Sequence, residues 1–234
     1  MADFDGDGEN DLYTGCYEGG VYRLAGKGKG EFAAPEPVLD EQGNVLRLGM
    51  FWNYETKKWD KVATSKFADE LGIAAAAVDW DADGDLDLIL GSQSGHLFLR
   101  RNRGSPEKAS FAATSEQLSS GDRPLAVEGA HAMPVVADWD GDGNWDLLSG
   151  SAQGGVVWFR NAGTAAEPKL APCERLVPAG KLDGDAPGQR TQVNVADFDG
   201  DGRLDLLVGD YRSKRVDDKY DWHGYVWVYR RRAP

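Results

Sequence analysis

The amino-acid sequence predicts an all-β fold made of four consecutive four-stranded repeats, which would form the blades of a β-propeller. One acidic loop recurs four times, its copies are similarly spaced, and the segments after each copy keep the same order. The loops begin at residues 3, 79, 138 and 197, which gives intervals of 76, 59 and 59 residues. Such periods are typical of propellers and solenoids. A stacked β-solenoid is the alternative, although its coils are usually shorter.

Each repeat is expected to supply its strands in a fixed order. The first strand precedes the loop and is rich in small residues, which suit a crowded innermost position: residues 74–78, 134–137 and 193–196. The second strand follows the loop, as at 86–90 and 204–208. The third alternates aromatic and β-branched residues, a typical strand pattern: 20–24, 95–99, 155–159 and 224–228. The fourth follows a turn and contains Phe-Ala-Ala-type segments: 31–39, 110–118 and 169–177. Only residues 65–72 are expected to form as much as a helical turn.

The two terminal repeats are expected to be incomplete. Only residues 1–2 precede the first loop, and the last repeat stops after its third strand with residues 230–234. The expected strand counts of three, four, four and three do not close a ring, so we expect an arc or a fragment of a larger propeller with exposed edges. The expected divisions are blade 1 at 1–39, an insertion at 40–66, blade 2 at 67–128, blade 3 at 129–181, and blade 4 at 182–234 with an insertion at 211–222.

Each acidic loop reads Asp-x-Asp-x-Asp-Gly-x-x-Asp, a pattern that predicts a cation site. Calcium takes six to eight oxygen ligands, and carboxylates at positions 1, 3 and 5 converge when the backbone curls around an ion. The Gly at position 6 permits the sharp turn. Position 12 lacks the Glu that completes an EF-hand, so the position-9 carboxylate is expected to close the shell.

The predicted carboxylate ligands are Asp3, Asp5, Asp7 and Asp11; Asp79, Asp81, Asp83 and Asp87; Asp138, Asp140, Asp142 and Asp146; and Asp197, Asp199, Asp201 and Asp205. Position 7 is expected to bind through its backbone carbonyl while its side chain faces water: Glu9, Asp85, Asn144 and Arg203. The aromatic residue at position 2 is expected to pack beneath the loop. Merely hydrophilic turns are the alternative, but four copies with the same fixed positions disfavour it.

Calcium is favoured over magnesium, which prefers to keep several waters, and over zinc, because no loop contains His or Cys. The net charge of −13 is concentrated in these loops, and four calcium ions would reduce it to −5 (−13 + 8). Nucleic acid is therefore an improbable partner. Cys16 and Cys173 lack metal or redox spacing, and a disulfide between them is left open. No stretch is long enough to insert into a membrane, and no signal peptide is visible.

The loop, the following Asp-Leu and the Gly-x-Val-x-aromatic strand together resemble the FG-GAP/VCBS repeat family, including integrin α-subunit propellers and secreted bacterial VCBS-type proteins. The resemblance extends over nearly the whole chain outside 40–66 and 211–222. It implies up to four structural calcium ions bound by the Asp residues at positions 1, 3, 5 and 9. It also implies an extracellular or periplasmic module for binding, cell adhesion or scaffolding. Its partner would be a protein or a glycan, or a further part of a propeller or another chain at the open edges.

Four other residues are candidate ligand-binding residues. Trp52 and Trp59 lie in the first insertion, where exposed aromatics suit sugar rings or proteins, although they could instead cover a blade. His131 and Arg190 lie seven residues before their loops, which places them near the axis on the face opposite the loops. The alternative function is therefore a propeller enzyme of the lyase or dehydratase type that acts on carbohydrate near His131 and Arg190. No catalytic residues are evident, so a non-enzyme is favoured.

Overall fold

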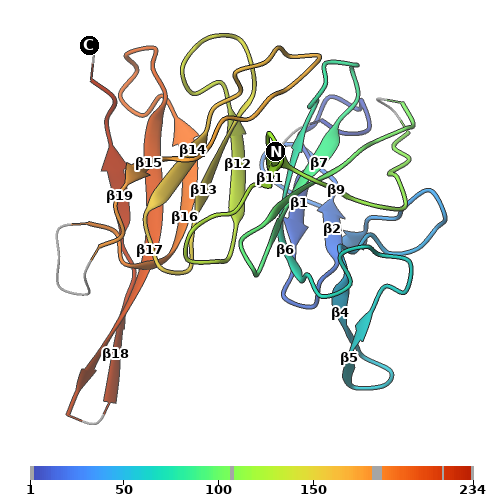
Figure 1. Cartoon of the computed structure of the whole chain (residues 1–234), viewed down its shortest axis with the longest axis horizontal. Helices are drawn as coiled ribbons and strands as arrows, with labels where there is room; N and C mark the ends of the chain where they lie inside the picture. The colour runs from blue at the N-terminus through green and yellow to red at the C-terminus, as the bar shows by residue number, and fades with distance from the viewer. Residues whose placement is uncertain (1–2, 106–107, 181–185, 218, 233–234) are drawn as a thin grey trace.

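The computed structural model of the chain describes residues 3–105, 108–180, 186–217 and 219–232 (Figure 1). These residues form β-strands and loops and contain no helix, including at 65–72. Four antiparallel sheets follow one another around a common axis in the manner of a four-bladed β-propeller. The predicted fold class is confirmed, whereas the expectation that the blades belong to a larger ring stays a prediction.

The first two sheets are built from the N-terminal half of the chain. The first sheet has the order β1 (Leu12–Gly15), β2 (Val21–Leu24) and β3 (Glu36–Pro37). The second sheet has the order β6 (Gly72–Val78), β7 (Asp87–Ser92), β8 (Leu97–Arg100) and β9 (Glu116–Gln117). The acidic loop connects β6 to β7, so it lies at one end of the innermost pair of strands.

The third and fourth sheets repeat this arrangement. The third has the order β12 (Met133–Ala137), β13 (Asp146–Gly150), β14 (Val156–Phe159) and β15 (Glu174–Val177). In the fourth, β16 (Gln189–Ala196) pairs with β17 (Asp205–Val216), and β17 pairs with β19 (Val226–Tyr229). The outermost strands are shorter than the Phe-Ala-Ala-type segments predict, because only the second half of each segment pairs with its neighbour.

Three hairpins project from this framework. The insertion at 40–66 contains β4 (Met50–Asn53) paired with β5 (Lys58–Lys61). The insertion at 211–222 extends β17 into a hairpin with β18 (Lys219–His223), which points away from the fourth sheet in Figure 1. A short hairpin of β10 (Ser119–Ser120) and β11 (Arg123–Pro124) follows the second sheet.

The hydrophobic core lies between successive sheets. One cluster joins the first and second sheets, a second joins the second and third, and a third joins the third and fourth. The aromatic residue at loop position 2 belongs to these clusters in three loops, as Phe4, Trp80 and Trp139. Phe198 is 53% exposed, so the predicted packing role is wrong for the fourth loop. The physical reason is that each aromatic residue packs against the sheet that follows it, and no described sheet follows the fourth.

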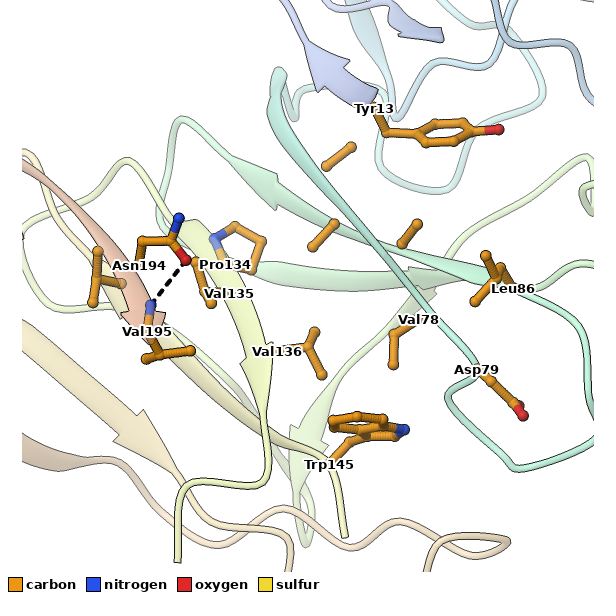
Figure 2. Close-up of a pocket in the computed structure, with 14 residues that line it drawn as sticks. Tyr13, Val78, Asp79, Leu86, Pro134, Val135, Val136, Trp145, Asn194 and Val195 are labelled. Carbon is orange, nitrogen blue, oxygen red and sulfur yellow. Dashed lines mark hydrogen bonds between the residues drawn. The ribbon is translucent and has the colours of Figure 1, made fainter. Parts of the chain in front are cut away.

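The strands nearest the axis are β6, β12 and β16, which precede their loops, and β1, which follows its loop and is equivalent to β7 and β13. Adjacent members contact one another in the order β1–β6, β6–β12 and β12–β16. Residues of all four strands line an axial cavity of about 550 Å³, into which Trp145 projects from the third acidic loop (Figure 2). Ala75, Ala76 and Ala77 of β6 line this cavity and are half-buried, so the reason given for small residues in the innermost strand stays a prediction.

Candidate metal centres

Carboxylates converge in all four acidic loops. In three loops the side chains at positions 1, 3 and 5 each place an oxygen within 4.8 Å of the other two: Asp3, Asp5 and Asp7; Asp79, Asp81 and Asp83; and Asp138, Asp140 and Asp142. In the fourth loop the corresponding group is Asp197, Asp199 and Asp205, so position 9 takes the place of position 5. Groups of this kind could hold a metal ion, and their all-oxygen chemistry suits a hard cation such as calcium.

The position-1 carboxylate holds the loop in its curled shape. Asp138 Oδ1 accepts hydrogen bonds from the backbone N–H groups of Gly141 (2.8 Å) and Asp142 (3.0 Å), and Asp138 Oδ2 accepts one from Gly143 (2.9 Å). Gly141 and Gly143 have φ values of 80° and 86°, in the left-handed region that glycine adopts most readily. These hydrogen bonds and the two glycine conformations therefore hold the loop backbone in a curl around the carboxylates.

The position-9 carboxylate is fully buried and connects the loop to the end of the third strand. Asp146 Oδ2 accepts a hydrogen bond from Trp139 N (3.2 Å), and Asp146 Oδ1 accepts one from Asn161 N (2.6 Å). Asp11 and Asp205 make the same pair of contacts in their repeats. Each carboxylate oxygen has more than one lone pair, so these bonds are compatible with metal ligation. The predicted ligand role of position 9 stays a prediction.

The second loop contains buried oxygens that lack hydrogen-bond partners. They are Asp81 Oδ1, Asp85 Oδ1 and Asp87 Oδ2. Burial raises the pKa of Asp87 to about 7, and burial together with the neighbouring loop carboxylates raises the pKa of Asp85. Buried charge is costly unless it is paired or coordinates a metal. Asp81 belongs to the group of Asp79, Asp81 and Asp83, so a divalent cation held there would give its unpaired oxygen a partner, and the residues of this loop fit a bound metal.

The expectation that every position-7 side chain faces water is wrong for Asp85, which is 7% exposed. Glu9 is exposed, whereas Asn144 and Arg203 are half-buried. The position of Asp85 before a buried strand does not explain the difference, because Asn144 precedes the equally buried β13 and is half-buried. Ligation through the position-7 carbonyl groups stays a prediction.

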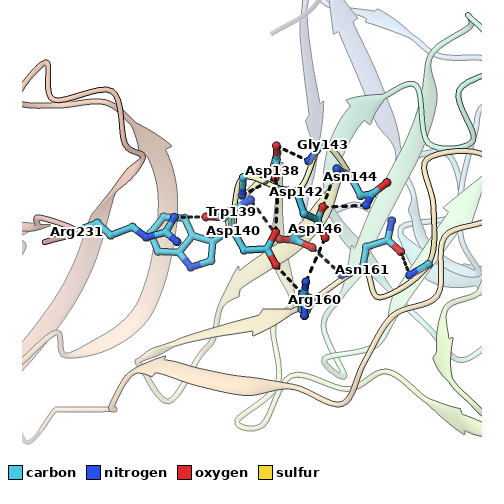
Figure 3. A network of polar contacts seen from close by, with 12 residues as sticks. Asp138, Trp139, Asp140, Asp142, Gly143, Asn144, Asp146, Arg160, Asn161 and Arg231 are labelled. Atoms are coloured by element: carbon cyan, nitrogen blue, oxygen red, sulfur yellow. Dashed lines mark hydrogen bonds and ion pairs between the residues drawn. The ribbon is translucent and has the colours of Figure 1, made fainter. Parts of the chain in front are cut away.

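An arginine faces the position-3 carboxylate in every repeat, a feature that the motif-based prediction missed. Arg160 Nε lies 2.6 Å from Asp140, and Arg160 Nη2 lies 3.3 Å from Asp142 (Figure 3). The equivalent ion pairs are Arg23 with Asp5, Arg101 with Asp81, and Arg230 with Asp199. Hydrogen bonding from Arg23 lowers the pKa of Asp5. The sequence contains a signal for this feature, because Arg101, Arg160 and Arg230 occupy the same position after the third strand.

The family comparison agrees with these repeats. A model described as an FG-GAP-like repeat matches residues 79–149 and 138–208, and one described as an FG-GAP repeat matches residues 190–229. The FG-GAP-like matches together span residues 79–208, more than half of the 234-residue chain. The chain belongs to the FG-GAP repeat family. Comparison with curated proteins gives no match.

The FG-GAP-like matches begin at Asp79 and Asp138, the first residues of the second and third acidic loops. Each FG-GAP-like match therefore covers one acidic loop, the strands that follow it in the same sheet, and the first two strands of the next sheet. This unit contains both sides of a sheet-to-sheet interface. The FG-GAP repeat thus includes the packing that buries the position-2 aromatic residue as well as the acidic loop.

His131 and Arg190 enter β12 and β16 of this FG-GAP protein at the strand ends opposite the loops. Both have positive φ values, 54° and 50°. Burial, and then the charge of Arg190, lower the pKa of His131. The His131 ring contacts Tyr17 edge-on at a centroid distance of 6.4 Å, and the Arg190 guanidinium lies over Tyr211. The structure brings the two residues near each other, while ligand binding or catalysis there stays a prediction.

Trp52 and Trp59 form a cross-strand pair in the β4–β5 hairpin, with ring centroids 5.6 Å apart. Trp59 is 47% exposed and Trp52 is half-buried, and ligand binding by this pair stays a prediction. Cys16 and Cys173 are both free thiols in the structure. Within the described residues, no helix has the length and hydropathy needed to cross a membrane.

Proposed function

We propose that this FG-GAP protein is a calcium-binding β-propeller module that serves binding, adhesion or scaffolding outside the cytoplasm. The observation that carries the proposal is the recurrence of a three-carboxylate cluster in all four loops, at positions 1, 3 and 5 in three of them and at positions 1, 3 and 9 in the fourth. Four clusters on four sheets suit a repeated structural ion better than a single reaction centre. Asp138, Asp140 and Asp142 exemplify the residues that would hold each ion.

Bound calcium would supply positive charge where the fold concentrates negative charge. The arginines at the position-3 carboxylates each contribute one positive charge, but every loop contains four or five acidic residues. The residual repulsion between carboxylates opposes folding, and a divalent ion would remove it. Calcium would also join the loop to the second strand, because Asp87 and its equivalents begin or precede that strand.

The proposed location follows from the family and from the chemistry of the ion. FG-GAP repeat proteins are commonly extracellular. Extracellular modules bind calcium with dissociation constants of about 10⁻⁴–10⁻³ M, and loops of this exposure suit that range. A propeller stabilised by such ions presents a rigid surface, and its inserted hairpins are suited to contact a protein or a glycan.

Thermal unfolding in excess EDTA, in CaCl₂ and in MgCl₂ tests the calcium role. A ligand that binds only the folded state stabilises it by about 2.7 kcal/mol per site when its concentration is 100 times the dissociation constant. We expect CaCl₂ to raise the melting temperature well above its value in EDTA, and MgCl₂ to raise it less. Equal melting temperatures in EDTA and CaCl₂ would contradict the proposal.

A further inference from the structure

An arginine beside the third acidic loop contacts oxygens that a metal ion would use (Figure 3). Asp140 Oδ1 accepts a hydrogen bond from Asp142 N (3.3 Å), and Asp142 Oδ1 accepts two from the backbone and side-chain N–H groups of Asn144 (2.9 Å each). The second oxygen of each carboxylate faces Arg160: Asp140 Oδ2 lies 2.6 Å from Nε, and Asp142 Oδ2 lies 3.3 Å from Nη2. A cation held by this cluster and the Arg160 guanidinium would therefore compete for the same two oxygens.

The fold places Arg160 here through its backbone. Arg160 directly follows β14, and its carbonyl group accepts a hydrogen bond of 2.8 Å from Ala171 N. The next residue, Asn161, donates its N–H to Asp146 of the same loop over 2.6 Å. The Arg160 side chain is 45% exposed, so it lies outside the core and its charge can be removed without opening a cavity.

The first repeat retains this contact although a different residue supplies it. Arg101 and Arg160 directly precede the residue whose N–H binds the position-9 carboxylate, and Ala25 occupies that position in the first repeat. Arg23, two residues before Ala25, pairs with Asp5 instead. Side chains two residues apart along a strand lie on the same face, so Arg23 reaches its loop from the same side. The contact is therefore not merely a by-product of the repeated sequence.

The hold of the guanidinium on the carboxylates differs among the loops. Arg160 contacts two carboxylates of its cluster, whereas Arg101 contacts Asp81 and also Glu116 of β9, which lies outside the loop. Arg230 Nε is 3.8 Å from the position-3 carboxylate of the fourth loop. The third loop, in which the guanidinium holds two cluster carboxylates, is therefore suited to a test.

The charge of the guanidinium acts in opposite directions on the two states of the loop. Arginine is not deprotonated in proteins, so its charge is always present. Without a metal ion, this charge offsets the repulsion among the carboxylates and stabilises the loop. When a cation binds, the same charge repels it and occupies its ligands, and so weakens binding. An arginine that only oriented the ligands would have the opposite effect, since loss of such a residue usually weakens metal affinity.

We propose that the arginine at each position-3 carboxylate is a resident counter-ion that stabilises the metal-free loop and weakens calcium binding. This inference rests on the proposed calcium-binding function and adds a residue that sets the affinity of the same sites. A permanent competitor raises the calcium concentration that fills a loop, which agrees with dissociation constants of about 10⁻⁴–10⁻³ M in extracellular modules. The loops then stay folded when calcium is scarce and fill when it is plentiful.

Two-dimensional ¹H–¹⁵N NMR of the whole chain measures calcium binding loop by loop. Gly143 N donates to Asp138 in the third loop and Gly84 N donates to Asp79 in the second, so the amide signals of these glycines report on separate sites. As CaCl₂ is added in steps, the Gly143 signal of Arg160→Gln should give a dissociation constant at least about threefold lower than that of the wild type. The Gly84 signal should give the same value in both proteins.

Two further variants separate charge from other effects of the substitution. Arg160→Lys keeps the positive charge and should bind calcium in the third loop within about twofold of the wild type. Arg175→Gln removes the same charge from β15 of the same sheet, where Arg175 pairs with Glu128 rather than with a loop carboxylate. It should leave both dissociation constants unchanged.

Thermal unfolding in EDTA measures the metal-free state. Arg160→Gln should lower the melting temperature by about 1–3 °C, because the metal-free carboxylates lose their counter-charge, and Arg175→Gln should lower it less. Calcium binding by Arg160→Gln that is equal to or weaker than that of the wild type would overturn the inference. Arg160→Lys that binds as tightly as Arg160→Gln, or an unchanged melting temperature of Arg160→Gln in EDTA, would also overturn it. A wild type without calcium-dependent shifts in any loop would overturn the proposed function as well, so the two failures are distinguishable.

Discussion

The second and fourth acidic loops have nearly the same sequence but different surroundings. Trp80 in the second loop packs into the core between the second and third sheets and is 3% exposed. Phe198 occupies the same position in the fourth loop and is 53% exposed. The third sheet follows the second, whereas no described sheet follows the fourth. The comparison teaches that a loop's packing depends on the next blade as well as on its own motif.

Four equivalent glycines lead to the same conclusion. A Cβ added at Gly15, Gly91 or Gly150 would lie within 2.7 Å of the backbone of the next innermost strand or the segment leading into it. A Cβ added at Gly209 in the fourth sheet would meet only Gln192 O, at 3.9 Å, which is an ordinary contact. The first three glycines permit adjacent sheets to approach closely, whereas no sheet among the described residues approaches the fourth.

The largest expected difference concerns the position-2 aromatic residue. Trp80→Ala should lower the free energy of unfolding by about 3–5 kcal/mol, because it leaves a cavity in the core between two sheets. Phe198→Ala should change it by about 0.5 kcal/mol or less, as is usual for an exposed residue. Urea unfolding of the two variants in the same buffer measures both values. Equal losses would show that Phe198 is covered in solution and would remove the distinction between the loops.

The next effect concerns the glycines. Gly91→Ala should destabilise the protein by about 1–3 kcal/mol, because the new Cβ would lie 2.1 Å from Ala132 O and force the second and third sheets apart. Gly209→Ala is the matched control and should change stability by about 0.5 kcal/mol or less. Thermal unfolding in the presence of EDTA separates this packing effect from metal binding. A larger loss for Gly209→Ala than for Gly91→Ala would contradict the proposed order of the sheets.

A smaller difference is expected in the response to calcium. Asp83→Asn should remove about 2.7 kcal/mol of calcium-dependent stabilisation if calcium is present at 100 times the dissociation constant of the second loop. Asp201→Asn should remove about 1 kcal/mol or less, since Asp201 lies outside the carboxylate cluster of its loop and pairs with Arg203. The measurement is the difference in unfolding free energy with CaCl₂ and with EDTA. A larger loss for Asp201→Asn would reverse the predicted ranking of the loops.

Much of the fold could be predicted because the repeats are visible in the sequence. Four copies of the loop fixed the number of sheets, and the alternating pattern after each loop located β2, β8, β14 and β19. The burial of Asp85 and the exposure of Phe198 could not be predicted in this way. A repeat pattern treats equivalent residues alike, whereas burial depends on which sheet packs next to each copy.

The groups that surround the carboxylates could not be predicted from the motif either. The ion pair between Arg160 and Asp140 joins the end of a third strand to a loop about 20 residues earlier in the chain, so it requires the pairing register of the sheet. The same holds for the hydrogen bond from Asn161 to Asp146. The motif predicted which carboxylates converge, and the sheet determines which other groups surround them.

The most direct test of the account is the anomalous scattering from crystals grown in CaCl₂. We predict a peak between the carboxylates at positions 1, 3 and 5 of the first three loops, with the highest occupancy in the second, where buried oxygens lack hydrogen-bond partners. The fourth loop should give a weaker peak. Crystals grown with saturating calcium that show no peak in any loop would contradict the account.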